Sequence, residues 1–415
     1  MSSEYYLRTH CRMCDGIDLV KVMGLPPTPP GNNFLREDEL ANPEPAYPLD
    51  LYLCQTCTHA QLGHVVDPRI LYQKNYPYVS STSPEFVRHL QDYAADMVNR
   101  FALEPGALVA DIGSNDGTCL RFFQQRGIKV IGVDPAVQIA QRATAAGIET
   151  VPDFFGYSLA QELRKKYGPA KFITSHNACA HIDHLDEVMR GVEHWLRDDG
   201  VFVLEVGYFV DVYSNLWFDT IYHEHLDYHT VAPFNHLFAR TGLEPISAIR
   251  VSPQGGSIRI MAQKTGGPFE ADATVDALID LERSLDLDKA SAFERYFERI
   301  EAVGLELRTL VASLKQSGKA LSAFGATTKG TTLLATLGVG RESVEFIVDD
   351  NPLKQGLYSP RLHIPVVPPE ELYRRNPGYL LILAWNFADP IMAKHLKYSM
   401  GGGRFIIPMP EPRIV

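Results

Sequence analysis

The chain has 415 residues, of which 45% are hydrophobic and 21% charged, values typical of a soluble globular protein with more than one domain. Its formal net charge is −11, and its 39 basic residues form no dense run, which argues against a nucleic-acid partner. No apolar stretch approaches the ~20 residues of a membrane span, and no charged-then-apolar leader opens the sequence, so we expect a cytoplasmic protein without a membrane partner.

Two cysteine pairs dominate the N-terminal part of the sequence. Cys11-x-x-Cys14 and Cys54-x-x-Cys57 each place two thiolates on one tight turn, the spacing from which tetrahedral zinc takes its ligands. Four sulfurs form a closed shell without an open position for chemistry, so we expect structural Zn²⁺. Residues 1–70 are otherwise rich in proline and glycine, and we predict a loop-rich zinc ribbon there that needs its metal for stability.

Residues 71–266 alternate apolar strands with amphipathic stretches, which is typical of a parallel sheet covered by helices. Apolar residues at helical spacing predict a helix over 84–101, and a second helix is predicted over 185–195. Strands are predicted at 108–112, 130–133, 172–176 and 201–206, with helices after the first two and a further strand pair at 243–251 and 257–263.

Residues 267–415 begin with a charged helical connection over 271–317 and then return to the alternating pattern. The predicted elements are a strand at 320–326, a helix at 331–337 and strands at 344–348 and 380–383. The alternation predicts a second Rossmann-like unit. Two such units in one chain suggest that two nucleotide-containing molecules are held facing each other, by analogy with folds that bind ligands at the carboxyl ends of their strands.

The segment Asp111-Ile-Gly-Ser-Asn-Asp-Gly117 follows an apolar strand and opens a helix, and Asp134 ends the next strand, where a carboxylate can take both ribose hydroxyls. The third glycine of a dinucleotide loop is absent, and Asp116 would repel a phosphate. S-adenosylmethionine has no phosphate and carries positive charges that suit an acidic loop. The simpler alternative is that the glycines only make a tight turn. The predicted cofactor residues are Asp111, Gly113, Ser114, Asn115 and Asp134, with Asp153 and Phe154 at the adenine and Asn177 at the methionine moiety.

The segment from Tyr222 to His229 packs three imidazoles, two carboxylates and two phenols into eight positions. One interpretation is a metal site formed by His223, His225 and His229, although their spacing matches no recognised ligand pattern. Another is acid–base chemistry, in which a histidine removes a proton next to a ketone and a phenol donates a hydrogen bond to the enolate oxygen. A third is a set of polar residues at the start of a helix.

Together these residues resemble the bacterial C-methyltransferases that act on nucleotide-linked 4-keto-deoxysugars, and the resemblance spans nearly the whole chain. It rests on the four-cysteine ribbon, the Asp111–Gly117 loop, Tyr222-His-Glu-His225 and the C-terminal segment Phe324-Gly-Ala-Thr-Thr-Lys-Gly330. The implied architecture is α/β: a zinc-binding module at 1–70, a Rossmann-like S-adenosylmethionine methyltransferase domain at 71–266, and a helical connection with a second Rossmann-like, nucleotide-sugar-binding domain at 267–415.

The resemblance also implies the roles of the catalytic residues. His225 is similar to the family's general base at carbon 3 of the sugar, and Tyr222 and Glu224 order the enolate region. Tyr76 and His181 join that pocket, although the nearby Tyr78 also suits ordinary packing and His181 also suits the cap of the following helix. The implied reaction is proton removal at carbon 3, formation of an enolate with the carbon 4 ketone, and attack on the sulfonium methyl group.

In the C-terminal unit, the turn at 325–331 lies between a strand and a helix, so backbone amides, hydroxyls and one ammonium group can hold a diphosphate. We predict substrate contacts from Thr328 and Lys329 in this turn and from Asn386 at another strand end. The resemblance favours thymidine diphosphate as the carrier. The alternative is a stabilising pseudo-domain without a ligand.

Two further functions fit parts of the sequence. One is a nucleic-acid methyltransferase whose zinc ribbon grips RNA, which the acidic charge disfavours. The other is a non-catalytic scaffold, which would not need the cofactor loop or the His225 segment. We expect a monomer or a weak homo-oligomer.

Overall fold

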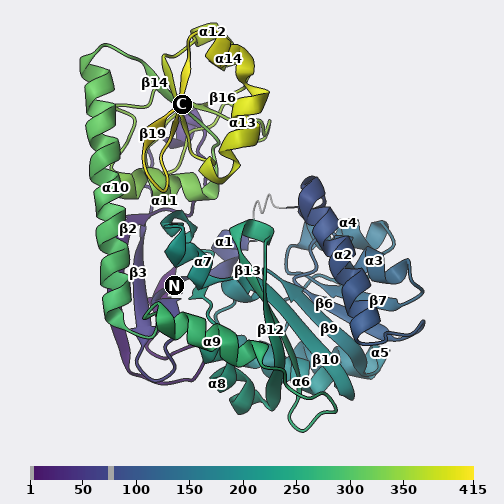
Figure 1. The fold of residues 1–415 in the computed structure, drawn as a ribbon. Coiled ribbons are helices and arrows are strands. Elements are labelled where there is room, and N and C mark those ends of the chain that lie inside the picture. Colours follow the sequence, from purple (N-terminus) through teal and green to yellow (C-terminus); the bar gives the residue numbers. More distant parts are fainter. Residues whose placement is uncertain (1–3, 73–78) are drawn as a thin grey trace.

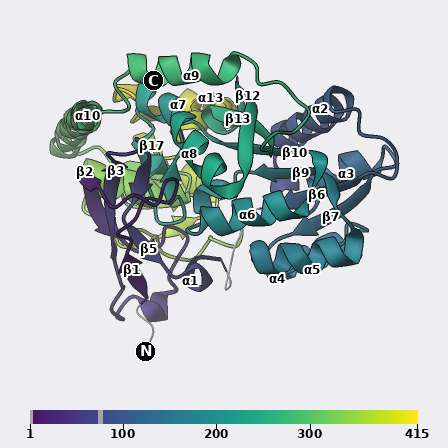
Figure 2. The same cartoon turned by 90° about the horizontal axis from the view of Figure 1, so that it is seen from below.

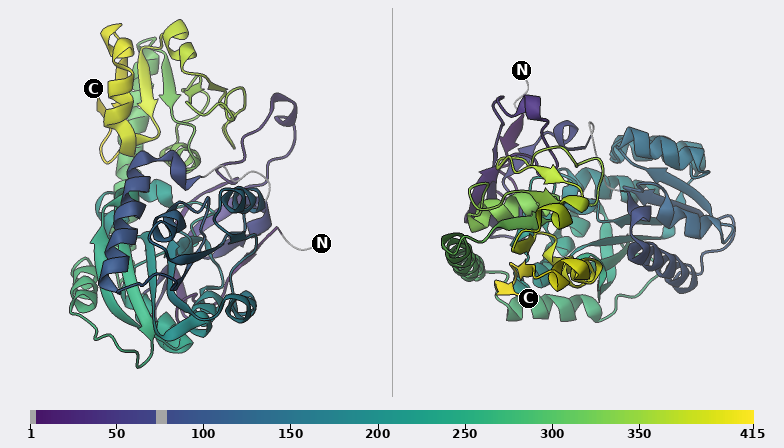
Figure 3. Two further views of the ribbon diagram at one scale, coloured as in Figure 1. Left: turned by 90° about the vertical axis from the view of Figure 1, so that its right-hand side faces the viewer. Right: turned by 90° about the horizontal axis from the view of Figure 1, so that it is seen from above.

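A computed structural model of the chain describes residues 4–72 and 79–415 and shows three parts, with one long helix that runs from the central part to the C-terminal unit (Figure 1). The predicted site residue Tyr76 lies outside the described residues. The zinc-binding module lies beside the long helix, and the C-terminal unit and the central sheet lie at opposite ends of the molecule (Figure 3, left). Among the described helices, none is long and apolar enough to cross a membrane.

The central part is built on a seven-stranded sheet with the order β12-β13-β10-β9-β6-β7-β8. Its five strands from β8 to β10 run parallel, β13 lies antiparallel to β10, and β12 lies antiparallel to β13. The carboxyl ends of β6, β7 and β9 therefore meet at one edge, where a Rossmann-like sheet binds its ligand. The strands are β6 (Leu108–Ile112), β7 (Lys129–Val133), β8 (Thr150–Val151), β9 (Ala170–His176), β10 (Leu196–Gly207), β12 (Leu243–Val251) and β13 (Ser257–Lys264).

Alternate residues of each strand point to opposite faces, so the sheet has two apolar layers. On one face, Val109 and Phe172 pack under α2 and α3, and on the other, Ala110 and Ile173 pack under α5, α6 and α8. Both layers are buried, which fits a parallel sheet covered by helices. The helices of this part are α2 (Pro84–Arg100), α3 (Thr118–Gln124), α4 (Val137–Ala145), α5 (Tyr157–Tyr167), α6 (Leu185–Trp195), α7 (Phe209–Ser214) and α8 (Ala232–Thr241).

Helix α2 forms where the sequence predicts it, because its N-cap residue, its first proline and its apolar spacing all favour a helix at these positions. The Ser83 side chain accepts a hydrogen bond from the Phe86 amide, and Pro84 occupies the first helical position. The buried residues recur every three or four positions and cover the sheet. They are Phe86, Leu90, Tyr93, Ala94 and Met97.

The zinc-binding module contains a four-stranded antiparallel sheet with the order β11-β4-β3-β2. Its edge strand β11 (Asp227–Tyr228) comes from the central part of the chain and pairs with β4 (Ala60–Leu62). The other two strands are β2 (Leu19–Thr28) and β3 (Tyr47–Cys54), and β1 (Tyr5–Leu7) pairs separately with β5 (His64–Val66), after which α1 (Pro68–Tyr72) follows.

Helices α9 (Thr274–Ser284) and α10 (Ala290–Gln316) connect the central part to the C-terminal unit. At 27 residues, α10 is about 40 Å long and packs beside β2 of the zinc-binding module (Figures 1 and 2). The sequence predicts one helical connection over 271–317, but the helix ends at Ser284 because Asp286 takes a left-handed conformation (φ 58°).

The C-terminal unit is a six-stranded sheet with the order β16-β15-β14-β17-β18-β19, parallel except for β19. The predicted α/β fold class, with a Rossmann-like sheet in both later parts, is confirmed. The strands of the C-terminal unit are β14 (Leu321–Phe324), β15 (Ile347–Val348), β16 (Val366–Val367), β17 (Tyr379–Ile382), β18 (Arg404–Ile407) and β19 (Arg413–Ile414). Its helices are α11 (Thr328–Leu337), α12 (Glu370–Arg375), α13 (Ala388–Lys394) and α14 (Leu396–Met400).

Candidate active site

The four predicted zinc ligands lie together. The sulfur atoms of Cys11, Cys14, Cys54 and Cys57 all lie within 4.8 Å of one another, with 3.4 Å between Cys11 and Cys57 and 3.5 Å between Cys14 and Cys54. A disulfide needs about 2.05 Å, whereas tetrahedral zinc with 2.3 Å bonds separates its sulfurs by about 3.8 Å. The cluster therefore fits zinc, and among the described residues no further His, Cys, Asp or Glu joins the four sulfurs, as expected for a structural site.

The cofactor loop turns sharply after β6. Gly113 and Gly117 take left-handed conformations, and a Cβ atom on Gly113 would lie 2.5 Å from the Cβ of Ala178. Asn115 is also left-handed (φ 51°), and its side-chain oxygen accepts a hydrogen bond from the Ser80 amide at 2.9 Å. The Ser114 hydroxyl is buried against Gly132. The loop is therefore shaped by close backbone packing on both sides.

Two buried carboxylates lie at the ends of β6 and β7. Asp134 accepts hydrogen bonds from the backbone amides of Asn115 at 2.8 Å and Ala136 at 2.9 Å, which fixes the loop. One carboxylate oxygen of Asp111 is buried without a hydrogen-bond partner, and burial followed by repulsion from Asp134 raises its pKa well above the ordinary value. Both ring nitrogens of the neighbouring His176 are also buried without partners. These orphaned groups fit the positively charged amino end of S-adenosylmethionine.

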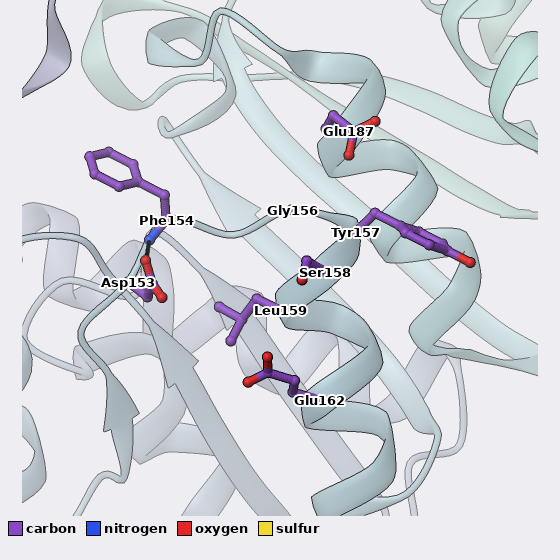
Figure 4. A pocket seen from close by; sticks show the side chains of 8 residues that line it. All are labelled: Asp153, Phe154, Gly156, Tyr157, Ser158, Leu159, Glu162 and Glu187. Atoms are coloured by element: carbon purple, nitrogen blue, oxygen red, sulfur yellow. Dashed lines mark hydrogen bonds between the residues drawn. The ribbon is translucent and has the colours of Figure 1, made fainter.

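The predicted adenine residues lie on the loop after β8. Asp153 and Phe154 line a surface pocket of about 250 Å³ with Gly156, Tyr157, Ser158, Leu159, Glu162 and Glu187 (Figure 4). The Asp153 carboxylate accepts a hydrogen bond from the Phe154 amide at 2.8 Å, and the Phe154 ring, 45% exposed, projects away from the residues of α5. Asn177 follows β9 in a left-handed conformation, and its amide donates to the Glu205 carbonyl at 2.7 Å.

His225 is held in one tautomer by its neighbours. Its Nδ1 lies 2.8 Å from the carbonyl oxygen of Thr220, which can only accept, so Nδ1 carries the proton. The Nε2 atom therefore accepts a hydrogen bond from the Tyr222 hydroxyl at 2.8 Å. Burial, followed by the nearby His181 ring, lowers the pKa of His225 well below its ordinary value. The imidazole is therefore neutral at pH 7 and has one basic nitrogen.

His181 lies beside this pair, with its ring centre 4.9 Å from that of His225. It belongs to the 3₁₀ helix η3 (Cys179–His181), and its Nδ1 donates to the carbonyl oxygen of Glu224 at 2.5 Å. The Tyr72 hydroxyl of α1 donates to the same carbonyl at 3.2 Å. The structure thus brings together two predicted catalytic histidines, and burial lowers the pKa of His181 as well.

The Glu224 side chain lies where all three parts of the protein meet. It is 4% exposed, and burial raises its pKa to about 7. The neighbouring Asn32 side chain of the zinc-binding module opposes this rise in pKa. The Asn32 side-chain oxygen in turn accepts from the Thr328 hydroxyl of α11 at 2.7 Å.

The proposed metal site of three histidines does not form. His223 is buried and directs Nε2 to the Tyr47 carbonyl oxygen at 3.1 Å, and the buried His229 ring packs on Phe234. Within residues 4–72 and 79–415, the His, Cys, Asp and Glu groups close enough to share an ion are the four cysteines and Asp111 with Cys119 and His176. The three histidines therefore face different surroundings.

The C-terminal unit presents Lys329 and η6 (Trp385–Phe387) to the central part. The Trp385 indole donates to the carboxylate of the buried Asp219 at 2.8 Å, and Lys329 lies 5.9 Å from the Trp217 ring centre. The positive charge of Lys329 acts on both Asp219 and His225. Of the other predicted substrate residues, Thr328 bonds Asn32, and Asn386 is exposed beside Trp385.

Sequence reasoning missed three residues that contact the cluster formed by His225, His181 and Trp385. Thr220 acts through its carbonyl oxygen, which no side-chain pattern reveals. Tyr72 ends a five-residue helix of the zinc-binding module, far from the pocket in sequence. Asp219 belongs to the short 3₁₀ helix η4 (Phe218–Thr220) just before the Tyr222–His229 segment, and its nearness to that segment was the available signal.

Family models match three successive segments of the chain. A zinc binding domain matches residues 11–72, a "Methyltransferase domain" matches 86–248, and a "C-methyltransferase C-terminal domain" matches 252–410. The chain is 35% identical to C-methyltransferase NovU of Streptomyces niveus, over 98% of this chain and 96% of the relative.

Solved structures with low sequence identity also match. An S-adenosylmethionine-dependent methyltransferase from Clostridium acetobutylicum is 12% identical, with a TM-score of 0.36 over 43% of this chain and 92% of the other. Magnesium protoporphyrin IX methyltransferase from Synechocystis, solved with the cofactor bound, is 15% identical, with a TM-score of 0.33 over 43% and 81%. From its full-length relative and its matching domains, the chain belongs to the bacterial sugar C-methyltransferase family, with S-adenosylmethionine as its methyl donor and zinc as its structural metal.

Proposed function

We propose that this enzyme adds a methyl group to carbon 3 of a nucleotide-linked 4-keto-deoxyhexose, with His225 as the general base. The observation that carries the proposal is the fixed tautomer of His225, whose Nδ1 proton is held by the Thr220 carbonyl. A neutral imidazole with one defined basic nitrogen suits removal of a proton from carbon next to a ketone. Such a base is needed for methylation at carbon, whereas an oxygen or nitrogen nucleophile already has a lone pair.

His225 Nε2 takes the carbon 3 proton, and the electrons of the C–H bond form the C3–C4 double bond of an enolate. The negative charge then resides on the carbon 4 oxygen. The cofactor would supply an electrophilic methyl group on its sulfonium. As carbon 3 bonds this methyl carbon, the S–CH3 bond would break, the carbonyl would reform and S-adenosylhomocysteine would leave. The proton remains on the imidazole, where the Thr220 carbonyl, which accepts from Nδ1, helps to stabilise the cation.

Tyr222 has two roles in this proposal. Nε2 has one lone pair, and without substrate it accepts the hydrogen bond from the Tyr222 hydroxyl. Substrate binding must turn that hydroxyl away, and the carbon 4 oxygen is the acceptor that we assign to it. His181 packs beside His225 and limits where the sugar can lie. Tyr76 is assigned to the same pocket from the family resemblance.

The nucleotide carrier is assigned to the face of the C-terminal unit that meets the central part. Lys329 brings a positive charge toward His225, and Asn386 is exposed next to Trp385, which contacts Asp219 of the central part. A diphosphate would pair with the Lys329 ammonium group, and Thr328 would order the turn through Asn32. Thymidine diphosphate is the carrier that we favour. We also propose that the enzyme works in the cytoplasm as a monomer or weak homo-oligomer.

The test is mass spectrometry of purified protein with methyl-labelled S-adenosylmethionine and a panel of nucleotide-linked 4-ketosugars. We expect label on carbon 3 of one sugar and exchange of the carbon 3 proton for deuterium in heavy water. A 4-hydroxy analogue of the accepted sugar is the matched control, because it lacks the ketone that acidifies carbon 3. Labelling of a structured RNA with every sugar unlabelled would reject the proposal.

A further inference from the structure

Arg12 lies inside the first zinc knuckle, between Cys11 and Cys14, and is fully buried. Its backbone amide donates to the side chain of Gln61 at 2.9 Å, which anchors the residue to β4. Its side chain leaves the knuckle and runs toward the central part of the protein. The zinc ligands on either side therefore fix the starting point of this side chain.

The guanidinium group contacts both segments that carry the pocket histidines. Its Nε donates to Asp183, two residues after His181, at 2.9 Å. Its Nη1 donates to the carbonyl oxygen of Leu62 at 2.8 Å and lies 3.5 Å from that of Leu226, the residue directly after His225. One rigid planar group thus touches the zinc-binding module, the His181 segment and the His225 segment.

Backbone hydrogen bonds join the same three segments. The Leu226 amide donates to the Ala180 carbonyl at 2.7 Å, and the Leu62 amide donates to the Leu226 carbonyl at 2.8 Å. Strand β11, which begins at Asp227, is an edge strand of the zinc-binding module. The segment that carries His225 is therefore hydrogen-bonded directly to the sheet of the zinc-binding module.

Two acids, one fully buried and one partly buried, balance the charge of Arg12. Asp227, fully buried, lies 3.9 Å from the guanidinium group and 2.7 Å from Nε2 of His59. Burial alone would raise the pKa of Asp183, but Arg12 and then Arg8 hold it below its usual value. Buried ion pairs of this kind contribute little net stability, because the cost of removing both charges from water offsets their attraction.

We propose that Arg12 is a positioning residue for catalysis: it transmits the fixed geometry of the zinc knuckle to both histidine segments and so sets the distance between His181 and His225. The inference rests on the proposed function for its kinetic consequences only. The zinc-binding module then acts as part of the acid–base pocket rather than as a separate domain.

Arg8 provides the matched control. Its Nη1 lies 3.0 Å from the same Asp183 oxygen, and its Nε donates to the His10 carbonyl. It is thus a second arginine on the same carboxylate, but it lies outside the zinc knuckle. Loss of a charge partner for Asp183 is common to Arg8→Met and Arg12→Met, whereas the link to Leu226 and Asp227 is specific to Arg12.

The experiment compares Arg12→Met, Arg12→Lys and Arg8→Met with the wild-type full chain. Bound zinc is measured by atomic absorption, S-adenosylmethionine affinity by calorimetry, and amide hydrogen exchange by mass spectrometry of peptides covering 178–184 and 222–229. For Arg12→Met we expect zinc content and cofactor affinity within twofold of wild type, with exchange in both peptides at least tenfold faster. For Arg12→Met we also expect kcat to fall at least 30-fold, with KM changed less than threefold. In Arg12→Lys, kcat and the exchange rates should recover in part. In Arg8→Met, the amides of residues 222–229 should exchange at the wild-type rate.

Equal exchange rates and kcat in Arg12→Met and Arg8→Met would overturn the proposal. If Arg12→Met does not fold, Arg12→Lys decides, because its single ammonium group keeps the buried charge but cannot contact both segments. Arg12→Lys must then show faster exchange at 222–229, and wild-type exchange with wild-type kcat rejects the inference. If the wild-type protein methylates no ketosugar, the proposed function fails, while the exchange measurements still decide the role of Arg12.

Discussion

Replacing His225 with asparagine separates the proposed base from the hydrogen bond that orients it. The asparagine amide group can still donate to the Thr220 carbonyl, which accepts from Nδ1 at 2.8 Å, but nothing replaces Nε2. The variant therefore loses the basic nitrogen and the 2.8 Å hydrogen bond from Tyr222, and one such bond is worth about 1 kcal/mol of stability.

The expected effect on turnover is much larger than the effect on stability. A positioned general base typically contributes about 10²–10⁴ in rate, or about 3–5 kcal/mol of transition-state stabilisation. We expect kcat of His225→Asn to fall by about that factor, with S-adenosylmethionine affinity unchanged. Deuterium exchange at carbon 3, measured in heavy water, should slow in parallel, because it reports proton removal without methyl transfer.

His223→Asn is the matched control for this variant. It makes the same substitution two residues away, on a buried ring that faces the Tyr47 carbonyl instead of the pocket. We expect a loss of about 1 kcal/mol of stability and turnover within a few-fold of wild type. Turnover of His225→Asn within threefold of wild type, or equal losses in both variants, would refute the assignment of His225 as the base.

Three further predictions concern Glu224, Trp385 and the metal. Because the pKa of Glu224 rises from an ordinary 4.5 to about 7 in the fold, its contribution to stability is present below pH 4.5 and is lost as pH rises to about 7. Thermal melting should therefore show Glu224→Gln gaining up to about 3 kcal/mol relative to wild type between pH 4.5 and 8. Trp385→Phe leaves Asp219 without its 2.8 Å donor, so initial rates should show KM for the nucleotide sugar raised about fivefold while calorimetry shows unchanged cofactor affinity. Removing zinc with a chelator should unfold the zinc-binding module and expose four titratable thiols, measured with a thiol reagent.

The sequence alone predicts the central elements well because their signals are local. Strand β6 and helix α6 have the predicted bounds, 108–112 and 185–195, since an unbroken apolar strand and a strongly one-sided helix leave little ambiguity. Strand β15 has only two residues where five were predicted at 344–348, because Val344 precedes the part of the segment that pairs with β14. A pattern of apolar residues indicates that a segment is buried, but a buried segment need not form a β-strand.

The proposed acid–base site is less predictable because its geometry comes from distant segments. The titratable cluster at 222–229 is visible in the sequence, but the orientation of His225 depends on the backbone of Thr220 and that of His181 on the backbone of Glu224. Carbonyl oxygens are present at every residue, so no residue pattern marks them. The contact of Arg12 with Leu226 joins positions 214 residues apart, which only the folded chain reveals.

The Tyr222–His229 segment is held mainly by parts of the protein outside the methyltransferase sheet. Leu226 and Asp227 bond the zinc-binding module, Glu224 reaches Asn32 of that module, and Asp219 just before the segment accepts the Trp385 indole of the C-terminal unit. A Rossmann-like sheet alone can bind the methyl donor, but it leaves a loop of this kind free to move. Proton removal from carbon needs a base held within hydrogen-bond reach of that proton. The two flanking parts therefore supply what carbon methylation demands beyond cofactor binding, and a truncated central domain should bind S-adenosylmethionine yet fail to exchange the carbon 3 proton.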